Sequence, residues 1–380
     1  MAAVVPMSSV DREEGESGND EKQFVNLFRR GVSLFDNEAW QQALEAFTES
    51  YRHASVLLPK RTLDVANIQV ERSRCLCLLS CYGQAEVALR EVESLLKQVP
   101  PEVKELPIVL RLWAGYSEAL ANLRRYQGRY AEGLAIIEQA MATLKDLSGL
   151  AFEYHQLMIH RGMLQKYLGN YEMARNSYLA SLDYHSASEN PSKMILADIY
   201  YNLSGACHAQ EKVNDGVRYG IQAFRLRAEF LAQGQSTIAL TLSIIAANLI
   251  LKKYFKLATR LVQKSLVIQR GIYGEQNRDI AMNLNHLGVI SYSIGDLSQA
   301  DSYFLTAFEM QKKCLDQFHP DLVVSLNNLL TVKLERQELE VIPEYQAAFK
   351  ELLEKNSDLS FRHNPKLLVA PSTPSDKSPL

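Results

Sequence analysis

Cysteine and histidine are the residues of this sequence best suited to metal binding or nucleophilic chemistry, and their spacing argues against both. Cys75, Cys77 and Cys81 lie close together, but they form no C-x-x-C pair, and no second Cys/His pair stands at zinc-finger spacing. His155 and His160 are separated by five positions, which misaligns them on a helix, and no H-E-x-x-H motif occurs. We therefore interpret the cysteines as small buried hydrophobic residues and predict no metal site.

Motifs for other chemistry are missing as well. The sequence contains no G-x-x-x-x-G-K-[ST] phosphate loop, no G-x-G-x-x-G dinucleotide motif and no G-x-S-x-G nucleophile motif. It has 41 Lys and Arg residues against 44 Asp and Glu residues, a formal net charge of −3, so its charge predicts no nucleic-acid partner. The prediction is a protein that is not an enzyme and that has no cofactor.

Two asparagines, Asn285 and Asn327, have side chains suited to holding a peptide. An amide offers two donors and an acceptor, so it can bind the backbone of an extended segment without reading its sequence. The same side chains could instead bond to a neighbouring loop or to water. Which of these applies depends on the elements that position them.

Those elements are indicated by small residues that recur on a regular grid. Ala174, Gly216, Ala258 and Ala300 follow one another at intervals of 42 residues, and each has a small residue twelve positions before it and another seven after it. Small side chains let one helix pass close to another, and such recurrence is typical of a helical repeat array. Extending the grid backwards through Gly133, Ala88 and Ala43 gives eight units over residues 22–355, the last one degenerate.

Each unit is predicted to be a helix, a tight turn and a second helix. In the fourth unit Gly162 lies on the first helix, Gly169-Asn170 makes the turn, and Ala174, Tyr178 and Ser181 share one face of the second helix. Units two, five and six lack a turn glycine at the matching place. Because no sustained period-two pattern occurs, the predicted fold class is all-α.

This pattern resembles the tetratricopeptide repeat family, whose usual period is 34 residues. The longer period, together with Gly274–Ala281 before Leu284-Asn285-His286-Leu287 and His319-Pro320-Asp321-Leu322 before Leu326-Asn327-Asn328-Leu329, resembles kinesin light chains and nephrocystin-like proteins. The resemblance implies a right-handed superhelical solenoid of about eight antiparallel helix pairs. It also implies that the two asparagines hold peptide backbone. A motor light chain has a long heptad coiled coil before its repeats, and we do not expect one in the roughly 22 residues that precede the first helix.

In such an array the first helices line a concave groove. On each first helix, the small residue of the grid and the large apolar residue four positions before it are expected to pack inward. The residue that follows each of these two is expected to face the groove, and so are residues one helical turn further along. The candidate partner-binding residues are Lys166, Tyr201, His208, Ser243, Asn285, Val289, Tyr292, Asn327 and Thr331. With Arg125, the basic members predict a protein or peptide partner that has apolar or aromatic anchors and acidic flanks.

Binding of a chaperone's C-terminal tail is not expected. Tetratricopeptide co-chaperones hold that carboxylate with Lys and Asn on three consecutive first helices. Here Phe28 and Glu118 occupy positions where cations are needed.

The two ends differ from the array. Residues 1–21 are acidic and residues 356–380 are rich in Pro and Ser, so both are expected to be disordered, with Thr373 and Ser378 as candidate phosphorylation sites before prolines. The longest apolar stretch, Ile238–Leu251, is expected to be a buried first helix and not a membrane span. Five cysteines without a secretion signal favour a cytoplasmic location, with association to the cytoskeleton left open.

Two functions fit these features. The first is an adaptor that binds a short linear segment of a partner in the concave groove. The alternative is a structural subunit of a larger cytoskeletal, ciliary or transport assembly that docks through its convex and edge surfaces.

Overall fold

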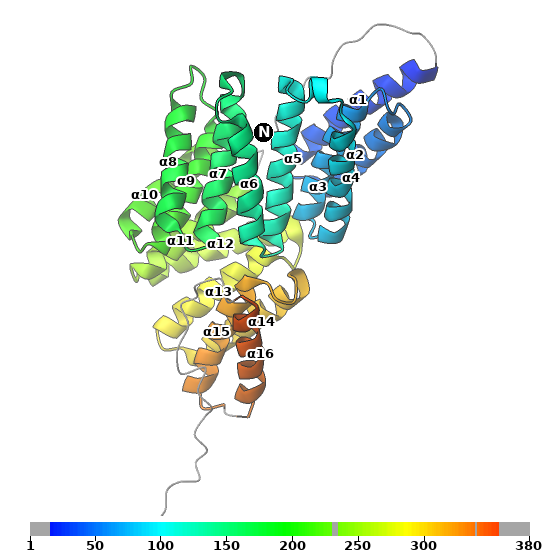
Figure 1. Cartoon of the computed structure of the whole chain (residues 1–380). Coiled ribbons are helices and arrows are strands. Elements are labelled where there is room, and N and C mark those ends of the chain that lie inside the picture. Colours follow the sequence, from blue (N-terminus) through cyan, green and yellow to red (C-terminus); the bar gives the residue numbers. More distant parts are fainter. Residues whose placement is uncertain (1–15, 230–234, 339, 357–380) are drawn as a thin grey trace, which may run out of the picture. The chain divides into compact units, whose positions relative to one another are not determined.

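The computed structural model describes residues 16–229, 235–338 and 340–356. Thr373, Ser378 and most of the two predicted disordered ends lie outside these ranges. Over the described residues the chain forms sixteen α-helices and two short 3-10 helices, η1 (Pro101–Val103) and η2 (Ser148–Leu150), with no strand. The all-α fold of paired helices predicted from the sequence is confirmed (Figure 1).

The chain divides into two compact bodies, residues 1–241 and residues 242–380. The N-terminal body contains α1 (Glu16–Asp36), α2 (Trp40–Ser55), α3 (Thr62–Leu78), α4 (Tyr82–Gln98), α5 (Pro107–Tyr126), α6 (Tyr130–Leu144), α7 (Ala151–Tyr167), α8 (Tyr171–Ser186), α9 (Lys193–Ala209) and α10 (Val213–Ala228). The boundary falls within α11 (Gln235–Leu251). The C-terminal body continues with α12 (Phe255–Tyr273), α13 (Arg278–Ser293), α14 (Leu297–Cys314), α15 (Pro320–Glu335) and α16 (Ile342–Lys355).

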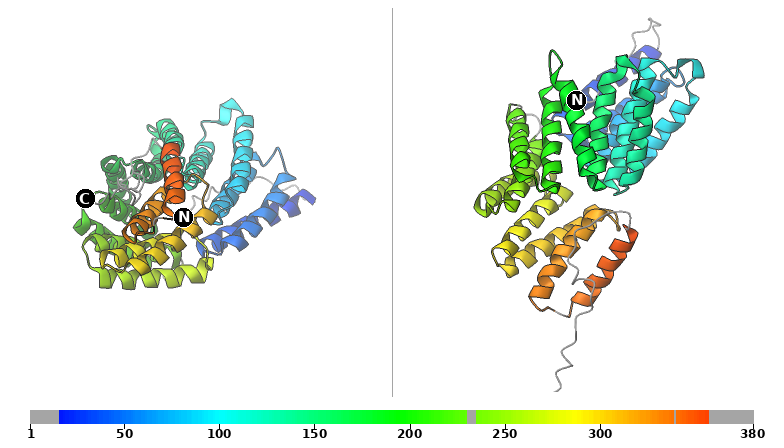
Figure 2. Two further views of the ribbon diagram at one scale, coloured as in Figure 1. Left: turned by 90° about the horizontal axis from the view of Figure 1, so that it is seen from below. Right: turned by 60° about the vertical axis from the view of Figure 1, so that its left-hand side comes forward.

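The sixteen helices follow one another as eight consecutive pairs, from α1 and α2 to α15 and α16, and the two helices pack against each other in repeats 1 to 5, 7 and 8. In repeats 1 to 4 the second helix also packs against the first helix of the next repeat, so the helices lie side by side as antiparallel neighbours (Figure 2). First helices of adjacent repeats touch as well, α3 with α5 and α5 with α7. Odd-numbered helices therefore share one face of this body.

The core of each repeat depends on a close contact between its two helices. A β-carbon added to Gly31, Gly162 or Gly288 would lie 2.5–2.6 Å from the ring of Phe47, Tyr178 or Phe304, respectively. Each glycine is on a first helix and each ring on the following second helix. The rings are almost completely buried. At these three small residues an aromatic ring lies against backbone, whereas at Gly133 an added β-carbon would meet Leu164 and the carbonyl of Ala121.

The turn inside every repeat contains one residue in the left-handed conformation. It is glycine in three repeats (Gly128, Gly169 and Gly295) and another residue in the remaining five, Glu38, Ser80, Glu211, Lys253 and Gln337, with φ of 58–61°. The following residue donates its N–H to the carbonyl five positions earlier, as Arg129 does to Arg124 at 2.8 Å. Repeats that lack glycine thus make the same turn, at a cost of about 1–2 kcal/mol per residue.

The position of this turn shows that the register predicted for the second repeat is wrong. In repeats 1, 3 and 4 the grid residue follows the left-handed residue by five positions, as Ala43 follows Glu38. In repeat 2 the left-handed residue is Ser80, so the equivalent position is the fully buried Ala85 and not Ala88 as the spacing predicted. The prediction failed because the loop around η1 lengthens the following connection, which hides the true interval.

The first and last helices show two further features. Helix α1 begins at Glu16, earlier than the expected start at Lys22. The apolar stretch Ile238–Leu251 lies in α11, where Ile238, Ala246 and Leu249 are buried, as expected for a first helix. No helix in the described part of the chain has both the length and the apolar character needed to cross a bilayer.

The glycine–ring contact predicts an asymmetry between two glycine substitutions. Replacing Gly288 with Ala should destabilise the protein by about 1–3 kcal/mol, because the ring of Phe304 has to move. Gly271 on α12 is the matched control, since an added β-carbon there meets no atom within 4 Å. Gly271→Ala should be neutral or stabilise by up to ~1 kcal/mol. Chemical denaturation measures both, and equal stability of the two variants would contradict the packing described.

A second prediction concerns pH and the buried His185 of α8. Burial lowers the pKa of His185 to about 4, from an ordinary 6.5, and also lowers the pKa of His155, whose ring stacks on Tyr184. A lowered histidine pKa means that stability is complete above the ordinary value and is lost as the pH falls toward the folded value. The free energy of unfolding should therefore drop between about pH 6.5 and 4, by ~1.4 kcal/mol per pKa unit. His185→Gln should flatten that slope, and an unchanged slope would refute the assignment.

Candidate functional site

A pocket of about 370 Å³ opens on the face shared by the first helices of the N-terminal body. Its lining comes mainly from α3, α5 and α7, with Phe35 from α1 and Asp198 from α9. Apolar side chains such as Leu112, Phe152 and Met163 alternate there with charged and amide groups. The pocket therefore offers both apolar contacts and hydrogen-bonding groups on the side of the array where the sequence predicts a groove.

Four ionisable residues form a chain of contacts along this pocket. An Arg74 guanidinium nitrogen lies 2.6 Å from a carboxylate oxygen of Glu71, and the other terminal nitrogen lies 3.4 Å from Glu118. The second carboxylate oxygen of Glu118 lies 3.4 Å from Nε2 of His160. Because the four residues come from α3, α5 and α7, the chain joins the three helices that form most of the pocket.

Burial and neighbouring charge set the ionisation of these groups. Burial opposes ionisation of Glu118, but the charges of Arg74 and His160 outweigh it and hold the pKa of that carboxyl well below its usual range. Burial raises the pKa of Glu71, although Arg74 counteracts it. Burial also disfavours the charged form of Arg74, but Glu71 and Glu118 together raise the pKa of its guanidinium. The pocket thus contains a carboxylate–guanidinium pair that stays charged at neutral pH.

Amide side chains provide further hydrogen-bonding groups. Asn122 on α5 lies 3.4 Å from Nδ1 of His160 and accepts a 3.2 Å hydrogen bond from Nε of Arg125. Asn67 on α3 also lines the pocket, and within the described residues its side-chain amide has no hydrogen-bond partner. Asn67 is therefore available to donate to and accept from a bound molecule.

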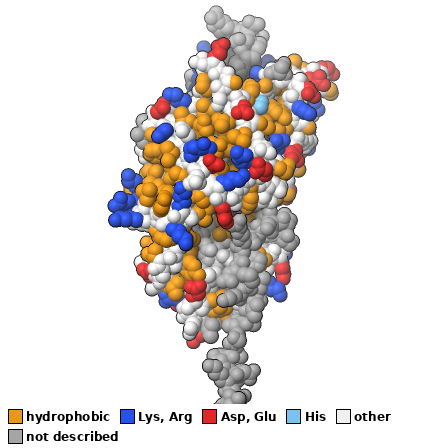
Figure 3. Space-filling model, turned by 90° about the vertical axis from the view of Figure 1, so that its left-hand side faces the viewer, with side chains coloured by type: hydrophobic (Ala, Val, Ile, Leu, Met, Phe, Trp, Pro, Cys, Tyr) orange, Lys and Arg blue, Asp and Glu red, His pale blue; other side chains and the backbone are white. Residues whose placement is uncertain are grey.

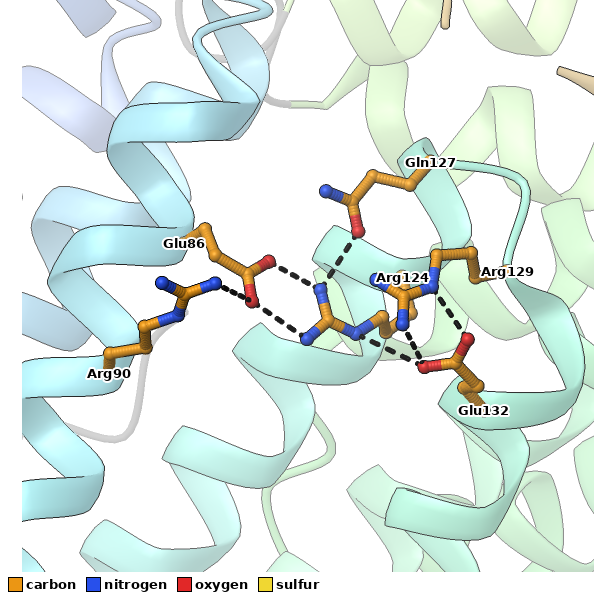
Figure 4. Close-up of polar contacts among 6 residues, drawn as sticks. All are labelled: Glu86, Arg90, Arg124, Gln127, Arg129 and Glu132. Atoms are coloured by element: carbon orange, nitrogen blue, oxygen red, sulfur yellow. Dashed lines mark hydrogen bonds and ion pairs between the residues drawn. The ribbon is translucent and has the colours of Figure 1, made fainter. Parts of the chain in front are cut away.

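Helix α5 is held in place by an ion pair on its opposite side. Arg124 points away from the pocket and makes a bidentate contact with Glu86 of α4, at 2.5 and 2.9 Å, and a 2.9 Å hydrogen bond to Gln127 (Figure 4). Hydrogen bonding to Arg124 lowers the pKa of Glu86. The contact fixes α5 against repeat 2, and so it helps to position the α5 residues that face the pocket.

The three predicted groove residues of the N-terminal body lie outside this pocket. Lys166 lies over the ring of Tyr167 at 5.0 Å. Tyr201 is covered by the buried guanidinium of Arg227, also at 5.0 Å. His208 is half-buried near the end of α9. Arg125, which the sequence analysis assigned to the groove, does line the pocket.

The predicted residues of the C-terminal body form contacts between adjacent first helices. Asn285 donates to Oγ of Ser325 at 2.9 Å and accepts from Asn328 at 3.2 Å, and Asn327 donates to Asn328 at 3.3 Å. These bonds make an amide row between α13 and α15.

The other four predicted residues of this body also make contacts within it. Ser243 is buried, with its hydroxyl 3.4 Å from Nδ1 of His286. Tyr292 donates to Glu335, and this hydrogen bond raises the pKa of Tyr292 to about 12. Val289 packs against the core, and Thr331 donates to the carbonyl of Asn327.

The two sequences that resemble kinesin light chains begin helices. Nδ1 of His319 accepts the N–H of Asp321 at 3.1 Å and caps α15, and Oδ1 of Asn277 accepts the N–H of Asp279 at 2.7 Å and caps α13. Asparagine therefore performs at α13 the capping role that histidine performs at α15. Arg278 also contacts Asp321 at 2.8 Å and joins the two helix starts.

The cysteines are packing residues, as the sequence predicted. Cys75 and Cys77 are buried and Cys81 is half-buried, and all five cysteines are free. Burial raises the pKa of both Cys75 and Cys77 to about 12, so neither thiol is a ready nucleophile at neutral pH. In the described residues no three His, Cys, Asp or Glu side chains are arranged to hold a metal ion.

Several pocket residues were not proposed as binding residues from the sequence: Asn67, Glu71, Arg74 and His160. Arg74 could have been found from the sequence. In the corrected register of repeat 2 it is the residue that follows the small residue of the first helix, which is the position expected to face the groove, and the same rule gives Glu118 and Asn122 in repeat 3. Their mutual contacts could not be read from spacing, because they depend on how neighbouring repeats are stacked.

Comparison with known proteins places the fold. No protein-family model matches the sequence, and no curated protein matches it significantly. Among solved structures, a Rap protein complexed with competence and sporulation factor has a TM-score of 0.61 and 16% identity, over 78% of each chain. NprR in complex with its cognate peptide NprX has a TM-score of 0.53 and 17% identity, over 77% of this chain and 81% of that one.

A third structure, the Rap conjugation gene regulator of plasmid pLS20 in complex with the Phr* peptide, has a TM-score of 0.50 and 12% identity, over 88% of this chain and 90% of that one. At such identities the likeness concerns the fold. The chain has a tetratricopeptide-like fold of stacked helix pairs, similar to the folds of these three proteins.

Proposed function

We propose that this protein is an adaptor that binds a short linear segment of a partner protein in the pocket formed by α3, α5 and α7. The observation that carries the proposal is a concave, partly apolar pocket lined by the unpartnered amide of Asn67 and by the chain of contacts from Glu71 to His160. Peptide backbone needs both donors and acceptors, and the pocket offers both beside apolar surface. The three similar structures were determined as complexes, two of them with a named peptide.

The charge of the partner is a finer part of the proposal. Arg111, whose side chain is 37% exposed and pairs with Glu153 at 3.0 Å, and Arg125 lie on the lining of the pocket. Acidic residues flanking an apolar anchor would contact these guanidinium groups, while the anchor would pack against Phe152 and Met163. Weak, transient binding in the micromolar range is proposed, which corresponds to about −8 kcal/mol.

We also propose that the later repeats belong to the longer, kinesin-light-chain-like and nephrocystin-like type. The first helices of repeats 4 to 8 begin at Ala151, Lys193, Gln235, Arg278 and Pro320, intervals of 42 or 43 residues. Both helix caps of the resembling sequences are preserved in α13 and α15.

Filling the pocket tests the main proposal. A β-carbon added to Gly115 on α5 meets only Arg74, at 3.9 Å, so Gly115→Leu should place a side chain in the pocket without disturbing the core. Peptides selected from a random library on the full chain should bind this variant at least ten-fold more weakly, about 1.4 kcal/mol, by fluorescence polarisation. Gly83→Leu on α4 is the control, because an added β-carbon there meets nothing within 4 Å and Gly83 lies outside the pocket. Equal loss with both variants, or no loss with either, would contradict the assignment.

A second site of backbone recognition is proposed at the amide row of Asn285, Asn327 and Asn328. Asn285 uses one N–H for Ser325, so its second N–H is left for a peptide. Replacing Asn285 and Asn327 with Ala should lower the affinity of selected peptides about ten-fold, since each lost hydrogen bond contributes ~0.5–1.5 kcal/mol.

The variant Ser325→Ala separates a structural role of the same amides from a role in peptide binding. This change removes the acceptor of Asn285 but leaves every amide in place. If the asparagines bind peptide, Ser325→Ala lowers the free energy of unfolding and leaves affinity unchanged. If the double asparagine variant only loses stability while its folded fraction binds normally, the amide row braces α13 against α15 and binds no peptide.

A further inference from the structure

Helix α12 has an outer face with an unusual composition. From Gln235 to Gly274 the sequence contains six basic residues and no Asp or Glu. The buried side of α12 consists of Ala258, Val262, Ser265, Leu266 and Gln269. Its exposed side contains Lys256, Leu257, Arg260, Lys264 and Val267. With 3.6 residues per turn these five positions fall in a single stripe about 100° wide.

The stripe combines positive charge with exposed apolar surface. Leu257 is 48% exposed and Val267 is 75% exposed, the highest value for a large hydrophobic side chain in the part of the chain that the structure describes. They are ten residues apart, or about 15 Å along the helix. Lys256, Arg260 and Lys264 lie between or beside them, and within the described residues none of these three cations has an ion-pair partner. Hydrophobic and basic side chains are also interspersed on the face of the molecule shown in Figure 3.

Several other cations of the C-terminal body, by contrast, are in ion pairs with nearby acidic residues. On the same helix Arg270 pairs with Glu275 at 3.2 Å. On α14 Lys312 pairs with Glu309 at 3.2 Å, and on α15 Lys333 contacts Asp301 and Glu338. Three unpaired cations in one stripe repel each other, and an acidic partner would remove that cost.

We propose that the exposed stripe of α12 is a docking surface for an acidic segment of a partner protein that carries two apolar side chains about 15 Å apart. Its carboxylates would pair with Lys256, Arg260 and Lys264, and its apolar side chains would cover Leu257 and Val267. The stripe lies on a second helix, whereas the pocket lies on first helices, so this surface is separate from the proposed peptide pocket. It is the kind of surface that docking into a larger assembly requires.

An elongated protein segment fits this surface better than a membrane or a nucleic acid does. The unpaired positive charge is only one helix wide. The other second helices of the C-terminal body, α14 and α16, carry both acidic and basic side chains. A planar anionic surface would meet those carboxylates as well, and a duplex would require a broader basic area.

The test uses the full chain and a defined probe. The probe is a synthetic peptide in which two leucines are separated by a run of Glu and Asp whose length matches about 15 Å as a helix. A peptide with Lys in place of every Glu and Asp is the charge control. Fluorescence polarisation should show binding of the acidic probe only, and binding should weaken as salt rises from about 0.05 to 0.5 M.

Two variants of α12 and one distant control locate the binding. Lys256→Glu with Lys264→Glu, and separately Val267→Asp, should each lower the affinity for the acidic probe at least ten-fold. Arg29→Glu with Arg30→Glu makes the same change in net charge on exposed residues of α1 and should leave the affinity unchanged. Gly115→Leu should also leave it unchanged, which distinguishes this surface from the pocket.

Several results would overturn the proposal. One is equal binding of the basic peptide, and another is equal loss of affinity in the α1 control. A third is an acidic probe that does not bind, while phosphatidylserine vesicles or duplex DNA bind the protein and lose that binding in the α12 variants. That last outcome would assign the stripe to a membrane or a nucleic acid.

Discussion

The fold depends on the close approach of the two helices within a repeat, and in three repeats an aromatic ring on the second helix lies against a glycine on the first. Gly31, Gly162 and Gly288 have no space for even a β-carbon, because a ring occupies it. Where the second helix has a smaller residue, such as Val262 or Gly220, the first helix has Ala246 or Ser204 in place of glycine. At Ala246 and Val262 the volume is shared between the two helices, whereas Ser204 and Gly220 are both small and Ser204 donates instead to the carbonyl of Gly216 at 2.7 Å. Within the N-terminal body the stacking of repeats places the odd-numbered helices on one face, where the pocket forms.

The repeats and turns were largely predictable from the sequence, for reasons that are local. A small residue at Ala174 or Ala300 reports a contact that recurs in every repeat, and Gly169 or Gly295 reports the turn directly. The features that the sequence did not predict also have physical explanations. Ser80 adopts the left-handed conformation without being glycine, so the turn of repeat 2 gave no signal and its register was misplaced. The division into two bodies also gave no signal, because it depends on contacts between repeats.

The candidate site was only partly predictable. A position rule on a single helix indicates which residues face the concave side. Of the residues that line the pocket, only Arg125 was assigned to the groove from the sequence, although the rule applied to repeat 3 gives Glu118 and Asn122. It could not show that Arg74, Glu118 and His160 meet, because these residues come from three repeats and their distances depend on how the helices stack. It also could not show that Asn285 bonds to Ser325 on the next first helix. Contacts between repeats are therefore where sequence reasoning is weakest and where the structure contributes most.

The central claim is that a peptide occupies the pocket of α3, α5 and α7. Hydrogen–deuterium exchange of the full chain, with and without a peptide selected from a random library, tests it most directly, because amide protection reports where the protein is stabilised. The account predicts slower exchange in α3, α5 and α7 on peptide addition, with the change abolished in Gly115→Leu. Protection confined to other helices, or protection that persists in Gly115→Leu, would contradict it.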